Sequence, residues 1–180
     1  LIVIVCDTLR RDYLGCYGNE WVHTPALDGL AFYFSLWPEL LRMELDQWTG
    51  YIEGGVLDHD MGVGLEANEM AYWHPMEIEE NTNFVLLLHH YWRRTGDRET
   101  VLRHFDEVTE LLAYVTAADT DADGFPEEGL YNTIDQGSPA IQYAPDQVYL
   151  AMRQITAYQA GAEMAREAGQ ADRAEAWTER

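Results

Sequence analysis

The sequence predicts a mainly α protein built of helical hairpins, with one short β-strand segment at its N-terminus. Three observations predict this fold class. Apolar residues recur at helical spacing along most of the chain after residue 31, and two long polar segments each precede an apolar helical stretch. The opening run LIVIVC is instead apolar and β-branched without interruption. With 47% hydrophobic residues among 180, the chain has material for a sizeable core and fits one domain or parts of two.

The first 31 residues differ in character from the rest of the chain. Residues 1–6 are typical of a strand that is buried on both faces, as in a parallel sheet. A helix is expected to begin near Thr24, because Thr favours the N-cap and Pro25 favours the first helical position. We therefore predict an N-terminal segment, 1–31, and a helical domain, 32–180, that meet without the usual polar linker.

The helical domain is expected to hold five helices, separated by two long loops. The spacing predicts a basic last turn and a glycine stop for the second helix, at Arg93-Arg94-Thr95-Gly96. The expected helices cover residues 35–48, 79–94, 98–118 and 145–168, with another that begins near 170, and the loops cover 50–76 and 119–143.

The chain is strongly acidic. Its formal net charge is −21, its pI is about 4.3, and all 11 basic residues are arginine. Such a charge excludes nucleic acid and anionic membranes as expected partners, because both require a basic surface. We expect a soluble protein, since no apolar run reaches the roughly 18 residues of a membrane-spanning helix and no signal peptide is recognisable. Leu1 in place of Met and the unfinished helical pattern at residues 176–180 indicate a fragment, so the localisation is left open.

The opening segment carries a specific string, Asp7-Thr8-Leu9-Arg10 followed by Asp12-Tyr13-Leu14-Gly15-Cys16-Tyr17-Gly18 and Thr24-Pro25-Ala26-Leu27-Asp28. Residues 1–31 resemble the N-terminus of sulfatases and related phosphohydrolases of the alkaline phosphatase superfamily. The resemblance implies that Asp7 is a ligand of a divalent metal. The family's Cys-x-Pro-x-Arg nucleophile motif is missing, since Cys6-Asp7-Thr8-Leu9-Arg10 lacks the proline, so sulfatase activity is not expected.

Two polar stretches of the helical domain bring together the residue types that sugar chemistry uses. The first runs over residues 54–64 and 74–83, and the second over 132–143. If the helices stack as hairpins, these stretches gather at one end and combine carboxylates, amides and aromatic rings. Paired carboxylates transfer protons in glycoside hydrolysis, while amides and rings recognise hydroxyl groups and sugar faces.

Residues 32–168 resemble part of the six-hairpin toroid glycosidases, the (α/α)6 class. His59-Asp60-Met61-Gly62 and the pattern from Asn132-Thr133-Ile134-Asp135 to Gln147-Val148-Tyr149-Leu150-Ala151 are similar to the family 52 β-xylosidases. The string Pro75-Met76-Glu77-Ile78-Glu79-Glu80-Asn81-Thr82-Asn83 is similar to the six-hairpin domain of the glutaminase A family. The expected fold is therefore a partial (α/α)6 toroid.

The resemblance implies a site in which Asp135 is the general acid. The family's nucleophilic Glu lies upstream of the matched region, where the sulfatase-like piece stands in this chain. An inverting enzyme needs only a general base, which Glu79 or Glu80 would supply, and the sequence does not choose between them. The side chains expected to bind sugar hydroxyls are His59, Asp60, Asn83, Gln136 and Gln142.

Other readings of the same residues stay open. Asp135 is also typical of a turn or helix cap, and Glu79 and Glu80 of acids in a helix's first turn. The expected function is carboxylate-catalysed hydrolysis of a glycosidic bond, for which no cofactor is required. The alternatives are a glutaminase A-like protein, a sulfatase-type hydrolase and a non-catalytic sugar-binding fragment.

A calcium loop is the remaining candidate site. Asp119-Thr120-Asp121-Ala122-Asp123-Gly124 alternates oxygen ligands and ends on a glycine, as the first half of a calcium loop does. The twelfth position is Leu130 rather than Glu, so the segment is not an EF-hand, and Glu127 or Glu128 would complete a shorter loop. The alternative is a solvated acidic turn between two helices.

Overall fold

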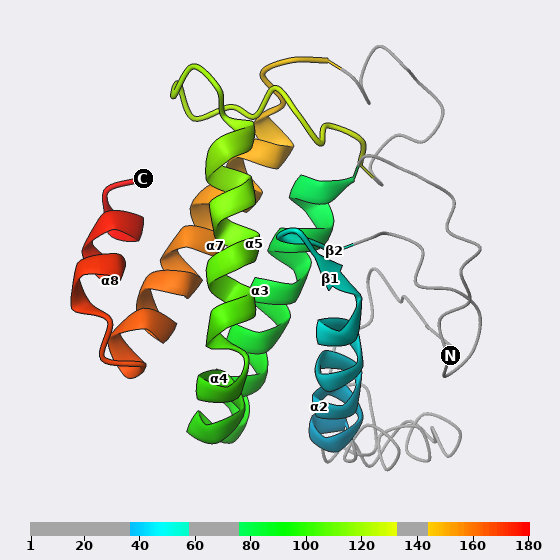
Figure 1. The fold of residues 1–180 in the computed structure, drawn as a ribbon, viewed down its shortest axis with the longest axis vertical. Helices are drawn as coiled ribbons and strands as arrows, with labels where there is room; N and C mark the ends of the chain where they lie inside the picture. Colours follow the sequence, from blue (N-terminus) through cyan, green and yellow to red (C-terminus); the bar gives the residue numbers. More distant parts are fainter. Residues whose placement is uncertain (1–36, 58–75, 133–143) are drawn as a thin grey trace, which may run out of the picture. The chain divides into compact units, whose positions relative to one another are not determined.

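The computed structural model describes residues 37–57, 76–132 and 144–180 (Figure 1). The chain divides into two compact units, Leu1–Leu41 and Arg42–Arg180, and nearly all of the described residues belong to the second. The predicted strand at 1–6, the helix expected near Thr24 and the junction after residue 31 lie outside the described residues.

The described part is mostly helical, which confirms the mainly α prediction. Its helices are α2 (Trp37–Trp48), η3 (Thr49–Tyr51), α3 (Glu77–Thr95), α4 (Arg98–Arg103), α5 (Phe105–Ala118), α7 (Val148–Glu167) and α8 (Ala171–Thr178), and its strands are β1 (Ile52–Glu53) and β2 (Val56–Leu57). Helices α3, α5 and α7 run side by side and pack against one another, and α8 packs against α7 (Figure 1). Among the described residues, no helix is long and apolar enough to cross a membrane.

Helix α3 shows why the periodic pattern predicted its existence and its end. Phe84, Val85 and Leu88 are fully buried against the neighbouring helices. The helix ends at Gly96, which adopts a left-handed φ of 74° and donates its N–H to the carbonyl of Trp92 at 2.7 Å. Glycine adopts this conformation without steric cost, so the predicted stop is confirmed.

The single helix expected over 98–118 is wrong, because the structure has two helices that meet at His104. His104 has φ −105° and ψ 16°, outside the helical range. Its ring is buried, with Nε2 2.7 Å from Oδ1 of Asp46, and it packs nearly perpendicular to the Phe84 ring, with 6.4 Å between the ring centroids. These tertiary contacts override the local preference for a continuous helix, and Asp97 caps the short first piece by accepting the N–H of Thr100 at 3.1 Å.

A small hairpin interrupts the segment that the sequence marked as irregular. Strands β1 and β2 pair antiparallel, with Ile52 opposite Leu57, across a two-residue turn. Both turn residues, Gly54 and Gly55, have positive φ angles of 62° and 79°, as a type I′ turn requires. A Cβ atom on Gly55 would lie 2.9 Å from the carbonyl oxygen of Glu110, so this position also needs glycine for close approach to α5.

The side chain of Asn81, on α3, holds the hairpin in place. Its Oδ1 accepts the N–H of Leu57 at 2.9 Å, and its Nδ2 donates to the carbonyls of Gly55 at 2.9 Å and Leu111 at 3.3 Å. Asn81 itself is fully buried. An isolated hairpin of this length is not stable in water, so the packed amide is what fixes it between α3 and α5.

Replacing Asn81 by Leu keeps the branched shape of the side chain but removes all three hydrogen bonds. The N–H of Leu57 and the carbonyl of Gly55 then lose their partner in a buried place, and we expect the free energy of unfolding to fall by about 2–4 kcal/mol. Urea unfolding followed by circular dichroism measures this change. Gln159→Leu, at an exposed position of α7, is the matched control. Equal stability of the two variants would contradict the assigned role of Asn81.

Candidate functional site

The first turns of α3 carry five consecutive polar residues, Glu79 to Asn83, on a helix that is otherwise largely apolar toward the core. Helices α3 and α7 begin, and α5 ends, at the same end of the helical bundle, which is the upper end in Figure 1. Tyr149 and Arg153 come from the first two turns of α7 and contact this polar string. Polar side chains from two neighbouring helices therefore meet at the end where the loops attach.

Glu79 is the most enclosed carboxylate of this group, with 4% of its surface exposed. Its Oε1 accepts the phenol hydroxyl of Tyr149 at 2.8 Å. Burial, and then the hydrogen bond to Glu79, raise the pKa of Tyr149 above its ordinary value, while the charge of Arg153 acts in the opposite direction. Tyr149 therefore stays protonated and keeps donating to the carboxylate.

Arg153 connects α7 to the polar string through several donors. Its Nε donates to Oγ1 of Thr82 at 2.9 Å, and its Nη2 donates to Oδ1 of Asn83. Nη2 also approaches the backbone carbonyl of Glu79 at 3.4 Å, and Nη1 approaches the hydroxyl of Tyr149 at 3.4 Å. Because a guanidinium presents its donors in a rigid plane, these contacts fix the side chains around it as well as Arg153 itself.

Asn83 extends this arrangement to the second candidate carboxylate. Its Nδ2 donates to Oε2 of Glu80 at 3.1 Å. A continuous series of contacts therefore leads from Glu80 through Asn83, Arg153 and Tyr149 to Glu79. We call the following set the α3–α7 polar network: Glu79, Glu80, Thr82, Asn83, Tyr149 and Arg153.

The structure thus brings together three residues that the sequence singled out, Glu79, Glu80 and Asn83. It adds Tyr149 and Arg153, which the sequence analysis did not single out. Tyr149 belongs to the string Gln147–Ala151 quoted above, which gave it no role, and its spacing of four residues from Arg153 places both on one face of a helix. The other predicted site residues, Asp7, His59, Asp60, Asp135, Gln136 and Gln142, lie outside the described residues.

A buried amide pair joins Asn132 and Gln147, which lie on either side of residues 133–143 in the sequence. Nδ2 of Asn132 donates to Oε1 of Gln147 at 2.6 Å. Nε2 of Gln147 donates to the carbonyls of Leu130 and Ala144, each at 3.1 Å. Both side chains are at most 9% exposed. Asn132 and Gln147, which flank this segment in the sequence, therefore lie together at the beginning of α7, two residues before Tyr149.

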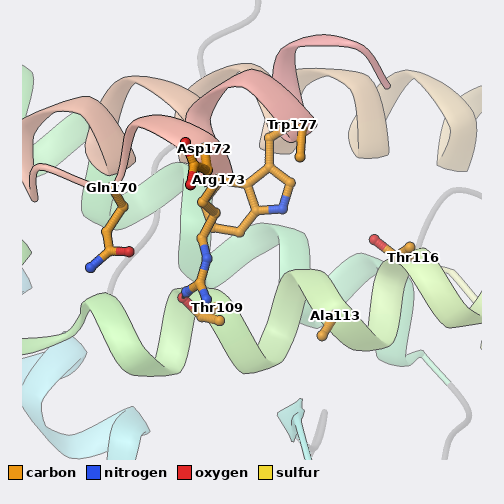
Figure 2. Close-up of a pocket in the computed structure, with 8 residues that line it drawn as sticks. Thr109, Ala113, Thr116, Gln170, Asp172, Arg173 and Trp177 are labelled. Atoms are coloured by element: carbon orange, nitrogen blue, oxygen red, sulfur yellow. The ribbon is translucent and has the colours of Figure 1, made fainter.

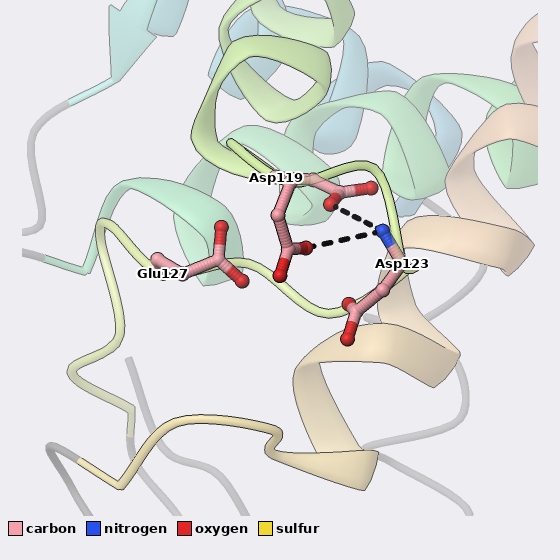
Figure 3. Close-up of side chains that lie close together, drawn as sticks. Asp119, Asp123 and Glu127 are labelled. Atoms are coloured by element: carbon pink, nitrogen blue, oxygen red, sulfur yellow. Dashed lines mark hydrogen bonds between the residues drawn. The ribbon is translucent and has the colours of Figure 1, made fainter.

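The acidic loop after α5 brings four carboxylates close together. Asp119, Asp121, Asp123 and Glu127 each offer a carboxylate oxygen, and these oxygens lie within 4.8 Å of one another. The N–H of Asp123 donates to Oδ1 of Asp119 at 3.1 Å and to Oδ1 of Asp121 at 3.2 Å, and Figure 3 shows Asp119, Asp123 and Glu127 close together. Gly124 completes the turn with a φ of 95°.

The structure selects Glu127 over Glu128 as the fourth carboxylate of this loop. The hydroxyl and N–H of Thr120 donate to Oε2 of Glu127 at 2.7 and 2.6 Å, and they hold the pKa of Glu127 below its ordinary value. Four carboxylates this close repel one another, and a hard divalent cation with several oxygen ligands would offset that repulsion. The geometry fits calcium, and calcium binding stays a prediction.

No family model, curated protein or solved structure shows significant similarity to the chain. The functional assignment therefore depends on the geometry of the described residues.

Calcium should raise the melting temperature of the protein. A ligand present at about tenfold its Kd stabilises by about 1.4 kcal/mol, which for a chain of this size is about 3–6 °C. Thermal unfolding with millimolar CaCl2, at matched ionic strength, measures the shift. The control variant Glu128→Gln should respond like the wild type, and Asp121→Asn/Asp123→Asn should not respond. An unchanged melting temperature in calcium would remove the site.

Tyr149→Phe should lower the free energy of unfolding at neutral pH by about 1–3 kcal/mol, through the lost hydrogen bond to Glu79. Because the pKa of Tyr149 is raised in the folded protein above 10.0, the folded state holds this proton more tightly than the unfolded chain. The wild type is therefore more stable than Tyr149→Phe by the full amount below about pH 10, and the difference in free energy of unfolding declines as the pH rises above 10. Denaturant titrations of both proteins from about pH 7 to pH 11 test this, and a constant difference would be inconsistent with it.

Proposed function

We propose that the chain carries part of a carbohydrate-active site of the glycoside hydrolase type, at the end of the bundle where α3 and α7 begin. The observation that carries this proposal is the buried carboxylate of Glu79, held by Tyr149 and connected through Arg153 and Asn83 to a second carboxylate, Glu80. Glycosidic bond hydrolysis uses carboxylates held in fixed positions, with amide and hydroxyl groups around them.

The proposed role of Glu79 is general base. In an inverting reaction the base takes a proton from water as the water attacks the sugar carbon, while a carboxylic acid on the other side protonates the leaving oxygen. Asp135, which lies in the sequence between the paired residues Asn132 and Gln147, is the proposed acid. Tyr149 donates to one oxygen of the Glu79 carboxylate and so holds the base in one orientation. Less conformational entropy is then lost when the base reaches its reacting geometry.

Burial is the reason to assign the base to Glu79 rather than Glu80. Glu79 is nearly inaccessible to bulk water, whereas Glu80 is half-buried and shares a hydrogen bond with Asn83. Glu80 and Asn83 together offer an acceptor and an amide, which is the usual chemistry for binding sugar hydroxyls. We assign these two residues to substrate binding.

The fold in this proposal is part of an (α/α)6 toroid. Helices α3, α5, α7 and α8 alternate in direction, and the polar network lies at the end where long loops connect them (Figure 1). The glutaminase A family shares the toroid expected from the sequence, so hydrolysis of glutamine is the competing enzymatic outcome, and sugar binding without turnover is the non-catalytic one.

The test is to compare Glu79→Gln with its neighbour Glu80→Gln on a panel of aryl glycosides, with glutamine and aryl sulfates as competing substrates. Loss of a general base should lower kcat about 10²–10⁴-fold in Glu79→Gln, whereas Glu80→Gln should mainly raise KM. Circular dichroism of both variants controls for folding.

Each outcome bears on a different part of the proposal. Equal kcat for the wild type and Glu79→Gln would remove the assigned base. Turnover of glutamine alone would replace the glycosidase by the amidase. Absence of both turnover and glycan binding in the wild type would overturn a carbohydrate function for this chain.

A further inference from the structure

A groove of about 550 Å³ lies between α5 and α8, away from the α3–α7 polar network. Figure 2 shows Thr109, Ala113 and Thr116 along the α5 side, and Gln170, Arg173 and Trp177 on the α8 side. Ala113 and Ala176 leave the space open because their side chains are small. The groove therefore combines a small apolar floor with a few polar groups.

Arg173 is held in a fixed position within this groove. Its guanidinium lies 5.9 Å from the centroid of the Phe105 ring and 5.8 Å from that of Trp177. Its Nη1 donates to Oγ1 of Thr109, whose own hydroxyl proton goes to the carbonyl of Phe105 at 3.0 Å. Aromatic contacts and a hydrogen bond from both helices thus immobilise the cation before any ligand arrives.

Most of the donors of Arg173 are unused within the part of the chain that the structure describes. A guanidinium has five N–H groups, and the contact with Thr109 accounts for one. Arg42, Arg93, Arg98 and Arg103 each form an ion pair with a carboxylate. Arg173 forms none with the described residues, including Asp172, which also lines the groove. Arg153 likewise forms no ion pair with a described carboxylate, but four oxygen atoms surround its guanidinium, whereas Arg173 has one such contact.

We propose that this groove binds a small organic carboxylate, with Arg173 as the residue that recognises it. A planar guanidinium edge matches the two oxygens of a carboxylate, and the alanines leave room for a small body behind it. The net charge of −21 opposes loose accumulation of anions on the surface, so an anion that binds needs a specific partner such as this one. The proposal is independent of the glycosidase assignment.

The expected affinity is modest, because the groove is open and offers one charged contact. A Kd of about 1–10 mM corresponds to such a contact. Lysine presents a point charge without the planar fork, so Arg173→Lys should weaken binding about tenfold, and Arg173→Gln should abolish it.

The test is an NMR titration of the full chain, following the Trp177 indole N–H and the Arg173 Nε–H. Glucuronate and glucose are the main probes, because they differ only in the carboxylate at C6, and acetate and sulfate extend the comparison at constant ionic strength. We expect saturable shifts with glucuronate and acetate and none with glucose. Arg166→Gln is the matched control, since Arg166 is an exposed arginine whose Nη2 bonds to Thr178 outside the groove.

Three results would overturn the proposal. No shift in the wild type up to about 50 mM glucuronate would leave Arg173 as a structural link between α5 and α8. Equal binding of glucose, or of sulfate, would remove the carboxylate as the recognised group. Since the wild-type titration decides these points, the proposal remains testable even if Arg173→Gln fails to fold.

Discussion

The beginning of α3 must bury polar side chains inside an apolar bundle, and much of the arrangement around it follows from that constraint. A buried polar group without a partner costs more free energy than a typical hydrogen bond contributes, so each side chain needs a partner in place. Asn81 accepts the N–H of Leu57 in the hairpin. Thr82 accepts a hydrogen bond from Arg153, and Glu79 accepts one from Tyr149. The same string therefore positions β2, α7 and both candidate carboxylates relative to one another.

The parts of the fold that depend on local signals could be predicted from the sequence. Apolar periodicity indicated the helices, and Gly96 indicated the end of α3. The break at His104 could not be predicted, because Val101, Phe105 and Val108 continue the helical spacing through it and Asp46, its partner, lies 58 residues earlier. The hairpin was missed because strands of two residues are too short to show an alternation of apolar and polar residues.

The candidate sites also differ in whether their residues are close together in the sequence or far apart. The acidic loop spans only nine residues, so a local sequence motif was enough to indicate Asp119, Asp121 and Asp123. The structure was needed only to choose Glu127 rather than Glu128 as the fourth carboxylate. The polar network joins α3 to residues about 70 positions later. Glu79, Glu80 and Asn83 form part of a recognisable string, but nothing in the sequence near Tyr149 and Arg153 indicates what they contact. Arg173 is similar, because its fixed position depends on Phe105 and Thr109 of another helix.

The hydrogen bond between Leu57 and Asn81 has a consequence for the order in which the molecule assembles. Its two ends are 24 residues apart in the chain, and the carbonyl of Leu111 that shares the same amide is 30 residues beyond Asn81. We expect contacts of this separation to form after the helices have docked, because the entropic cost of closing long loops is offset only by packing. The hairpin is therefore expected to form late in folding, and slow hydrogen exchange at the Leu57 amide would report that α3, α5 and the hairpin have come together.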